Sequence, residues 1–476
     1  MSHGLEGDIL KEACGVFGVW GLPEAAKLSL YGLYALQHRG QESAGIAAVS
    51  GRTISYVRGM GLLSDVFDGG VPDSLEGRAA IGHVRYSTTG SSCPENVQPL
   101  VFRYRQGQLA LAHNGNLVNA HYLRAQLEEG GSIFQTTLDT EVVAHLVAQR
   151  SRESLDHSIQ ASFQQVKGAY AFVFLTPEVM AGIRDPNGIR PLVLGKLDSG
   201  YILASETCAL DAVGAGFQRE VAPGELVMVD RYGLRSFQAL EPSVPSLCVF
   251  EHIYFARPDS QFNGTNVHAV RKALGRKLAE AYPVEADLVT GVPDSSVSAA
   301  AGYAEFSGLP YEMGLIKNRY IGRTFIQPSQ AQRDFAVRVK LNPMRRLVDG
   351  KRVVLVDDSI VRGTTSRHIV RLLKEAGARE VHLRISSPPY RFPCFYGIDT
   401  SAPSELVAAT KSLEEIRSSV EADSLFYLTN QQLFSALGSS EYCTACFDGK
   451  YPVEIPRGTG KSCLEVLPGE VPGCGR

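Results

Sequence analysis

Short apolar stretches alternate with glycine-rich and polar segments through the first half of the chain. The stretches 15–20, 109–112 and 170–175 predict strands because apolar, aromatic and β-branched residues follow one another there. Residues 138–149 instead carry apolar positions at helical spacing. Short strands mixed with helices predict an α+β fold for this half.

The pattern changes after a Pro/Ser-rich segment, 241–247, which is the best candidate for a linker. Beyond it, apolar strands at 287–292, 352–357 and 380–385 alternate with helical segments at 296–307 and 366–377. Near-continuous apolar strands that alternate with helices are typical of a parallel sheet covered on both faces. The sequence therefore predicts an α+β domain followed by an α/β domain.

Composition narrows the class of protein. The 476 residues are 44% hydrophobic and 20% charged, with a formal net charge of −3. The chain therefore has no net positive charge that would favour binding to nucleic acid or to an anionic membrane. No apolar run is long enough to predict a membrane span, and the polar N-terminus is unlike a secretory signal. Nine scattered cysteines do not form a small-domain disulfide framework. We expect a cytoplasmic protein.

One segment of the second half, 353–366, combines several features of a phosphate site. A predicted strand ends in Asp357 and Asp358, and a loop of small residues then leads into a helix. A helix N-terminus suits a phosphate through its backbone N–H groups, and the acids suit a ribose diol or Mg²⁺. A simple helix cap explains the hydroxyl residues alone, but not their combination with two acids and a glycine. The loop and helix residues in question are Gly363, Thr364, Thr365 and Ser366.

This segment closely resembles the motif with which type I phosphoribosyltransferases bind phosphoribosyl pyrophosphate (PRPP). The resemblance implies that Asp357 and Asp358 hold the ribose hydroxyls and Mg²⁺, while residues 363–366 hold the 5-phosphate. Residues 291–296 resemble the pyrophosphate loop, with Ser295 beside the metal. The stretch 317–340 resembles a mobile loop that closes over PRPP. Its basic residues suit an anionic leaving group, although each alone is also a common surface charge: Lys317, Arg319, Arg323, Arg338 and Lys340.

The first half contains a second set of motifs around Cys14. A cysteine before a strand is by default a buried structural residue. However, Cys14 is followed by the segments LQHRGQESAGI (36–46), GHVRYST (82–88) and AHNGNL (112–117). Together they resemble the glutaminase domain of amidotransferases with an N-terminal nucleophile, a four-layer αββα fold in which cleavage makes the cysteine the first residue.

The chemistry explains why that position matters. A free thiol is mostly protonated at neutral pH and needs a base. The α-amino group titrates near pH 8 and serves this role only if it belongs to the cysteine itself. We therefore expect residues 1–13 to be a propeptide that is removed, although Glu12 and Ala13 stand where this branch is expected to have paired acids.

The resemblance also implies roles for four further residues. Arg85 would bind the α-carboxylate of glutamine and Asp139 its α-ammonium group. The side-chain amide of Asn114 and the backbone N–H of Gly115 would stabilise the oxyanion. The two histidines of these motifs, at 83 and 113, are interpreted as satisfied core or turn residues.

Four cysteines of the second half form a candidate metal site: Cys248, Cys394, Cys443 and Cys446. Four thiolates suit either a tetrahedral zinc or an iron–sulfur cluster, and their spacing does not choose between them. We expect Cys93 and Cys208 to be ordinary buried thiols. Cys463 and Cys474 lie in a Pro/Gly-rich tail, 456–476, that we expect to be flexible.

Taken together, the two sets of motifs resemble the amidophosphoribosyltransferases, in the branch with a cleaved propeptide and a 4Fe-4S cluster at the four matching cysteines. This implies a propeptide at 1–13, a glutaminase domain at 14–245, a phosphoribosyltransferase domain at 246–455 and a tail. It further implies synthesis of 5-phosphoribosylamine from glutamine and PRPP, and a homotetramer inhibited by purine nucleotides. A nucleotide-sensing regulator on a phosphoribosyltransferase fold is the alternative, but the glutaminase motifs and the lack of net positive charge disfavour it.

Overall fold

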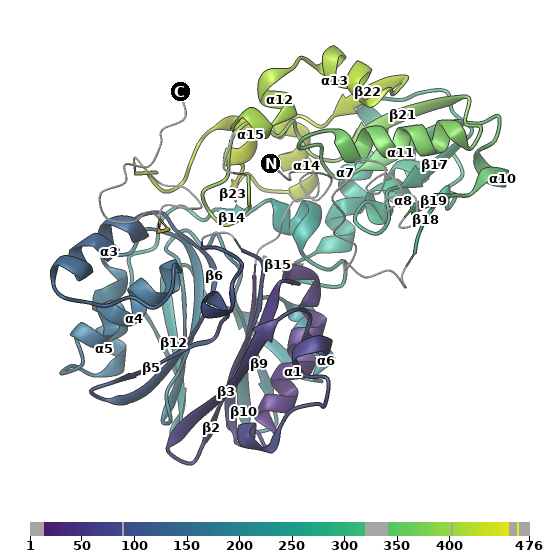
Figure 1. Cartoon of the computed structure of the whole chain (residues 1–476). Helices are drawn as coiled ribbons and strands as arrows, with labels where there is room; N and C mark the ends of the chain where they lie inside the picture. Colours follow the sequence, from purple (N-terminus) through teal and green to yellow (C-terminus); the bar gives the residue numbers. More distant parts are fainter. Residues whose placement is uncertain (1–13, 88–89, 319–340, 401–402, 457–463, 466–476) are drawn as a thin grey trace.

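A computed structural model describes residues 14–87, 90–318, 341–400, 403–456 and 464–465. They form two lobes, with the first half of the chain in one lobe and the second half in the other (Figure 1). The predicted propeptide, Arg319, Arg323, Arg338, Lys340, Cys463 and Cys474 lie outside the described residues.

Two antiparallel sheets face each other in the first lobe. One has the strand order β11-β9-β10-β1-β4-β2-β3 and the other β13-β12-β8-β7-β6-β5. The strands of the first sheet are β1 (Gly15–Trp20), β2 (Ser43–Ser50), β3 (Thr53–Met60), β4 (Ala79–Arg85), β9 (Val193–Leu197), β10 (Gly200–Ala204) and β11 (Gly216–Glu220). Those of the second are β5 (Leu100–Tyr104), β6 (Gly107–Leu117), β7 (Gly168–Leu175), β8 (Val179–Arg184), β12 (Glu225–Asp230) and β13 (Gly233–Gln238).

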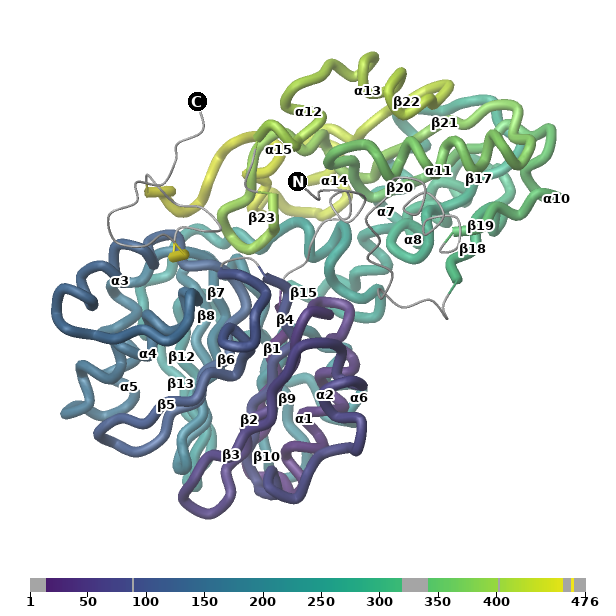
Figure 2. Tube along the Cα trace, in the orientation of Figure 1, coloured from purple at the N-terminus to yellow at the C-terminus, as the bar shows by residue number. Residues whose placement is uncertain are grey.

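Helices cover the outer face of each sheet, as Figure 2 shows. On the first sheet lie α1 (Ala25–Ala35), α2 (Leu63–Val66) and α6 (Thr207–Ala212), and on the second lie α3 (Ala120–Glu129), α4 (Asp139–Gln149) and α5 (Leu155–Phe163). Val16 and Ile81 of one sheet share a buried cluster with Ala112 and Val173 of the other. The predicted four-layer αββα arrangement is confirmed.

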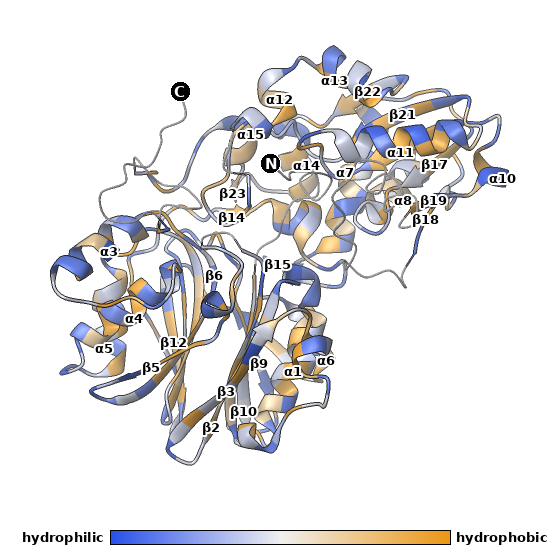
Figure 3. Ribbon diagram, in the orientation of Figure 1, coloured by the Kyte–Doolittle hydropathy of each residue, from blue (hydrophilic) through white to orange (hydrophobic). Residues whose placement is uncertain are grey.

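The second lobe is built around a parallel sheet with the order β17-β20-β21-β22. Its strands are β17 (Leu288–Gly291), β20 (Arg352–Asp357), β21 (Glu380–Ile385) and β22 (Ser424–Tyr427). The surrounding helices are α7 (Val267–Ala281), α8 (Val297–Ser307), α10 (Arg345–Val348), α11 (Thr364–Glu375), α12 (Val407–Thr410), α13 (Leu413–Val420), α14 (Asn430–Leu437) and α15 (Ala445–Asp448). Separate apolar clusters fill the two faces of the sheet, and hydrophilic and hydrophobic residues alternate along α11 (Figure 3). The predicted α/β fold is confirmed.

Several predicted elements have the bounds that the sequence pattern gave. The strands 15–20, 352–357 and 380–385 are reproduced, and 109–112 and 170–175 lie inside longer strands. The helix expected from Ser366 begins two residues earlier, at Thr364. Gly363 precedes it with a left-handed φ of 86°, which glycine adopts without strain and which starts the helix sooner.

The junction between the lobes is tightly connected. The candidate linker is fixed by hydrogen bonds from the N–H groups of Ser243 and Ser246 to the carbonyls of Pro186 (2.8 Å) and Asn187 (2.8 Å). Next to it, β14 (Leu247–Cys248) pairs in parallel with β23 (Tyr442–Cys443), so segments almost 200 residues apart lie side by side (Figure 1). Short two-stranded ribbons complete the lobe: β15 (Gln261–Phe262) with β16 (Thr265–Asn266), and β18 (Leu315–Lys317) with β19 (Leu341–Pro343).

In the tail that the sequence predicts to be flexible, the structure describes Pro456, Leu464 and Glu465. Leu464 is buried among apolar side chains that cover the second sheet of the first lobe. Within the described residues, none of the helices combines the length and the hydropathy needed to cross a membrane.

Candidate active sites

Cys14 lies immediately before β1, whose pairing with β4 brings it close to Arg85. Its thiol is buried and donates a hydrogen bond to the carbonyl of Tyr86 at 3.3 Å. Burial raises the pKa of Cys14, against the smaller effects of that hydrogen bond and of Arg85, which lower it. The thiol is therefore protonated at neutral pH and needs a base before it can act as a nucleophile.

A buried guanidinium holds the main chain at Cys14. Arg39 Nε donates to the Cys14 carbonyl at 3.1 Å, and the rest of the guanidinium binds two buried carboxylates, Glu206 at 2.6 Å and Glu251 at 2.8 Å. Burial opposes the charge, but these carboxylates hold the pKa of Arg39 above its ordinary value. Arg39 belongs to the quoted motif at 36–46, yet sequence reasoning gave it no role.

A histidine joins the two facing sheets beside the predicted oxyanion residues. Burial lowers the pKa of His83 to about 3, so the ring is neutral and its Nε2–H donates to the carbonyl of His113 on β6 at 2.9 Å. The next residue, Asn114, is fully buried, and neither polar atom of its amide has a partner among the described residues. His83 thus fixes β6 where Asn114 begins the oxyanion motif, although its buried Nδ1 has no partner among the described residues, so the ring is not fully satisfied as expected.

Gly115 occupies a position that no other residue fits. Its φ is 136°, and a Cβ added there would lie 2.0 Å from the carbonyl oxygen of Ala169 on β7. The absence of a side chain lets β6 and β7 pair with Gly115 opposite Tyr170. The backbone geometry next to Asn114 therefore depends on glycine.

Asp139, the first residue of α4, lies against the same stretch of β6. Its carboxylate accepts the Leu117 N–H at 2.9 Å and lies 3.5 Å from Nδ1 of His113. Burial acts to raise the pKa of Asp139, but His113 and the hydrogen bonds outweigh it and the pKa lies below its usual value. Asp139 is thus ionised, as a partner for an ammonium group must be. His113, interpreted as a core residue, in fact contacts this predicted binding residue.

Arg85, the predicted ligand of the glutamine carboxylate, is at the end of β4. Its guanidinium donates to the carbonyl of Ser91 at 3.2 Å and to that of Gly90 at 3.1 Å. The loop after β4 therefore holds the side chain by backbone carbonyls. Arg85 is almost completely buried.

The predicted PRPP loops meet at the carboxyl ends of two adjacent strands. Val292 N–H donates to the carbonyl of Val356 at 3.0 Å, which extends the pairing of β17 with β20. The Ser296 hydroxyl donates to Asp357 at 3.3 Å and lies 3.4 Å from the hydroxyl of Ser295, a residue that acts to lower the pKa of Asp358. The structure thus brings the predicted pyrophosphate loop to the two acids, at the edge where ligands bind in open α/β sheets.

Both acids are buried and close together. Burial raises the pKa of Asp357 well above its usual range, and the neighbouring charge of Asp358 adds to this. Burial also raises the pKa of Asp358, although Arg271 offers a compensating charge. A pair of this kind favours a cation, and Mg²⁺ with its preference for carboxylate oxygens suits the site.

The remaining PRPP residues line the same edge. Gly363 precedes α11, and Thr364, Thr365 and Ser366 form its first turn, which is the part of a helix that suits a phosphate. Of the basic residues predicted to close over PRPP, Lys317 is described, and its Nζ lies 3.0 Å from Asp294 of the pyrophosphate loop. The other four lie outside the described residues.

The four candidate ligand cysteines lie together in the second lobe. Cys248 pairs with Cys443 across β14 and β23. The Cys446 carbonyl accepts the N–H groups of residues 391 (2.9 Å) and 392 (3.0 Å), which brings the segment containing Cys394 to the same place. The four thiols are close enough for their charges to interact.

Burial raises the pKa of Cys248 to about 12. Burial also raises the pKa values of Cys443 and Cys446 well above the usual range, and the neighbouring thiols add to the effect. In the part of the chain that the structure describes, no group of three or more His, Cys, Asp or Glu side chains is arranged to hold a metal ion. The four thiols are therefore neighbours rather than a closed ligand set. Of the other cysteines, Cys208 is buried as expected, whereas Cys93 is only partly buried.

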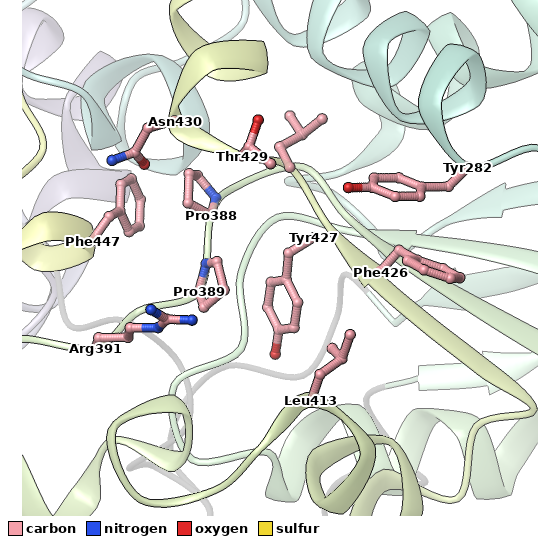
Figure 4. Close-up of a pocket in the computed structure, with 11 residues that line it drawn as sticks. Tyr282, Pro388, Pro389, Arg391, Leu413, Phe426, Tyr427, Thr429, Asn430 and Phe447 are labelled. Atoms are coloured by element: carbon pink, nitrogen blue, oxygen red, sulfur yellow. The ribbon is translucent and has the colours of Figure 1, made fainter.

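A cavity of about 440 Å³ lies at the carboxyl ends of β21 and β22. Figure 4 shows Arg391 and Tyr427 among its lining residues, with Tyr282 and Phe426 on one side and Phe447 on the other. It lies between the PRPP edge of the sheet and the helix that carries Cys446. None of the predicted substrate residues lines it.

The fold and the two sites define a glutamine-dependent transferase that joins a glutaminase domain to a phosphoribosyltransferase domain. Family models for a glutamine amidotransferase domain and a phosphoribosyl transferase domain match residues 83–212 and 263–386. The amidophosphoribosyltransferase of Bacillus subtilis is 55% identical over 94% of this chain and 96% of its own length, and that of Synechococcus elongatus is 50% identical over 95% and 94%. The chain belongs to the amidophosphoribosyltransferases, which catalyse the first step of purine biosynthesis.

The solved structures agree. The glutamine PRPP amidotransferase from B. subtilis, complexed with ADP and GMP, superposes with a TM-score of 0.90 at 54% identity, over 95% of this chain and all of the other. This match spans both lobes, so the two proteins share the fold of each domain and also the arrangement of the two domains.

Substitution of Gly115 tests the oxyanion geometry. Gly115→Ala should reduce glutamine hydrolysis by about 100-fold or more, which is the usual effect of losing one oxyanion donor, because the added Cβ meets the Ala169 carbonyl. Gly107→Ala is a matched control, since Gly107 is on the same strand with a φ of 117° but its Cβ would meet open space. Equal glutaminase rates in the two variants would contradict the assignment.

Proposed function

We propose that Cys14 releases ammonia from glutamine and that the Asp357–Ser366 segment binds the PRPP that consumes it. The observation that carries the first half is the fully buried, unpartnered amide of Asn114 beside Gly115. Leaving a buried amide without hydrogen bonds costs free energy. An oxyanion that forms at this place would supply the missing acceptor, so the cost is recovered in the transition state.

The proposed glutaminase chemistry follows from the state of the thiol. Cys14 is buried and protonated, so its own α-amino group is proposed to take the thiol proton once the propeptide is gone. Arg85 binds the α-carboxylate of glutamine, and the ionised Asp139 binds its α-ammonium group. Asn114 and Gly115 stabilise the oxyanion, and the thioester at Cys14 is hydrolysed to glutamate.

The proposed transferase chemistry uses the edge of the parallel sheet. Asp357 and Asp358 bind the ribose hydroxyls, and the start of α11 binds the 5-phosphate. Mg²⁺, held by the two acids near Ser295, would neutralise charge on the pyrophosphate leaving group. The raised pKa values of the acids support this role, because a bound cation would stabilise the ionised carboxylates that burial disfavours.

We propose that Cys248, Cys394, Cys443 and Cys446 bind a 4Fe-4S cluster. The support is the gathering of four thiols, of which Cys248, Cys443 and Cys446 are buried and stay protonated unless a metal centre stabilises the thiolates. The chemistry of this donor set also suits zinc, which remains the alternative. In either case the centre would connect β14, β23 and the segment around Cys394.

Regulation and assembly complete the proposal. The B. subtilis relative is complexed with ADP and GMP, which supports feedback inhibition by purine nucleotides here. We propose a homotetramer on the basis of the family. A cytoplasmic location agrees with the seven described cysteines, all of which are free thiols.

The division of labour is testable with two substitutions. Cys14→Ala should abolish glutamine-dependent synthesis of phosphoribosylamine but leave ammonium-dependent synthesis, since ammonia is made at one site and used at the other. Asp357→Asn should impair both. Pyrophosphate release measured with each nitrogen source separates the cases, and Cys93→Ala is a control for loss of a thiol. Substantial glutamine-dependent activity in Cys14→Ala would show that the nucleophile is wrong.

The metal centre is testable by colour and metal content. Protein with an iron–sulfur cluster should be brown and absorb broadly at about 400 nm. It should lose both its colour and its activity in air. Cys443→Ser should lose the iron, whereas Cys93→Ser should keep it. Colourless and fully active protein that contains zinc would favour the alternative.

Maturation is testable by intact-mass measurement. While residues 1–13 are attached, the nitrogen of Cys14 is an amide and cannot accept the thiol proton. The active enzyme should therefore lack these residues, and Cys14→Ala should retain them, since the thiol is the natural nucleophile for attack on the Ala13 carbonyl. Glutamine-active enzyme that still begins at Met1 would refute the amino-group mechanism and leave the PRPP site unaffected.

A further inference from the structure

A short helical segment, η4 (Glu251–Phe255), begins the second lobe three residues after Cys248. It is a π-helix, a form that is rare and frequently found at functional sites. It lies outside the matches to the two family models, which end at residue 212 and resume at 263. Its position between β14 and β15 puts it at the junction of the lobes (Figure 1).

Glu251 of this helix reaches into the first lobe. Its two carboxylate oxygens accept hydrogen bonds from Arg39, one from Nη1 at 2.9 Å and one from Nη2 at 2.8 Å. One oxygen also accepts from Arg190 at 3.5 Å. All three side chains are completely buried. A bidentate pair fixes the plane of the guanidinium as well as its position.

The same guanidinium holds the nucleophile. Arg39 Nε donates to the Cys14 carbonyl at 3.1 Å while its other two nitrogens are held by Glu251. Because the guanidinium is planar, the carboxylate determines the direction in which Nε points. The main-chain carbonyl of Cys14 is thereby fixed by a residue of the second lobe.

The other side of η4 is fixed within the second lobe. Arg271 on α7 donates to the carbonyls of His252 at 2.7 Å and Ala256 at 2.9 Å. Its charge also acts on Asp358 of the PRPP loop. Glu251 therefore lies on η4, and the backbone at this helix is hydrogen-bonded to Arg271, whose charge acts on the PRPP site.

We propose that Glu251 is a positioning residue of the glutaminase site, supplied by the phosphoribosyltransferase domain. It acts through Arg39, whose Nε orients the Cys14 main chain so that thiol and amino group face the substrate. Glu206 does not replace it, because that carboxylate meets Arg39 through Nη1 at 2.6 Å and is shared with His38. With Glu251 neutralised, the guanidinium is drawn towards Glu206, and Nε turns away from the Cys14 carbonyl. This proposal rests on Cys14 as the nucleophile.

The test is Glu251→Gln, which keeps the shape of the side chain and removes its charge. We expect kcat for glutamine hydrolysis to fall by about 10- to 100-fold, as a displacement of about 1 Å does, with KM for glutamine nearly unchanged. Ammonium-dependent synthesis should be retained, since the PRPP site is not altered. A purely structural role for Glu251 would instead lower both activities in proportion.

Glu225→Gln is the matched control. Glu225 is itself buried and forms a bidentate pair at 2.7 Å with Arg219, whose side chain is 40% exposed, and it makes no contact with Cys14 or Arg39 among its described hydrogen bonds. It should leave glutamine hydrolysis unchanged. If Glu251→Gln lowers kcat no more than Glu225→Gln does, the proposal is wrong.

A labelling experiment separates this proposal from the nucleophile assignment. The rate at which the reactive glutamine analogue 6-diazo-5-oxonorleucine labels Cys14 should be high in the wild-type enzyme and reduced in Glu251→Gln. It should also be reduced in Glu251→Asp, which keeps the charge and serves if Glu251→Gln does not fold. Wild-type enzyme not labelled at Cys14 would overturn the nucleophile, whereas equal labelling of the wild type and both variants would overturn only the role of Glu251.

Discussion

Four buried charges at the junction of the lobes must remain paired, and the geometry around Cys14 depends on this. Arg39 and Arg190 come from the first lobe, with Glu206, while Glu251 comes from the second, and all are completely buried. Removing one partner of a buried ion pair typically costs about 3–5 kcal/mol. A change in the angle between the lobes would separate such pairs, so the charges hold the lobes in one relative orientation more strictly than apolar contacts alone would.

Strand pairing explains how motifs far apart in the sequence form one glutaminase site. Cys14 and Arg85 are neighbours because β1 pairs with β4, and Asn114 approaches from the facing sheet on β6. The bond from His83 to the His113 carbonyl links these two sheets at the site itself. Rigid strands thus position the reactive groups. Groups on strands are held in place more precisely than groups on loops.

How much the sequence predicts differs between the sites for a physical reason. Residues 357–366 form a contiguous strand end, loop and helix start, so their proximity is local and could be predicted, although α11 begins at Thr364 and not at Ser366 because Gly363 starts the helix sooner. The fold of each half also follows from local patterns. By contrast, Arg39 and Glu251 are 212 residues apart, and nothing in either local sequence shows that a charge is buried. Such pairs depend on how the two lobes pack against each other. The pattern of apolar and polar residues along the chain carries no information about this packing.

Both sites share an electrostatic property that connects stability with function. The pKa of Cys14 and those of Asp357 and Asp358 are raised by burial, so each site disfavours the charged form that the chemistry needs. For the acids, a raised folded pKa means that ionisation at neutral pH costs stability, and this cost grows as pH rises through the unfolded value. A cation at the acids would remove the penalty there, and in the proposed mechanism the α-amino group of Cys14 would take the thiol proton once the propeptide is gone. Under the proposed function, the charge that completes each site would arrive with a substrate, a metal or a maturation step, and each site would stay inactive until then.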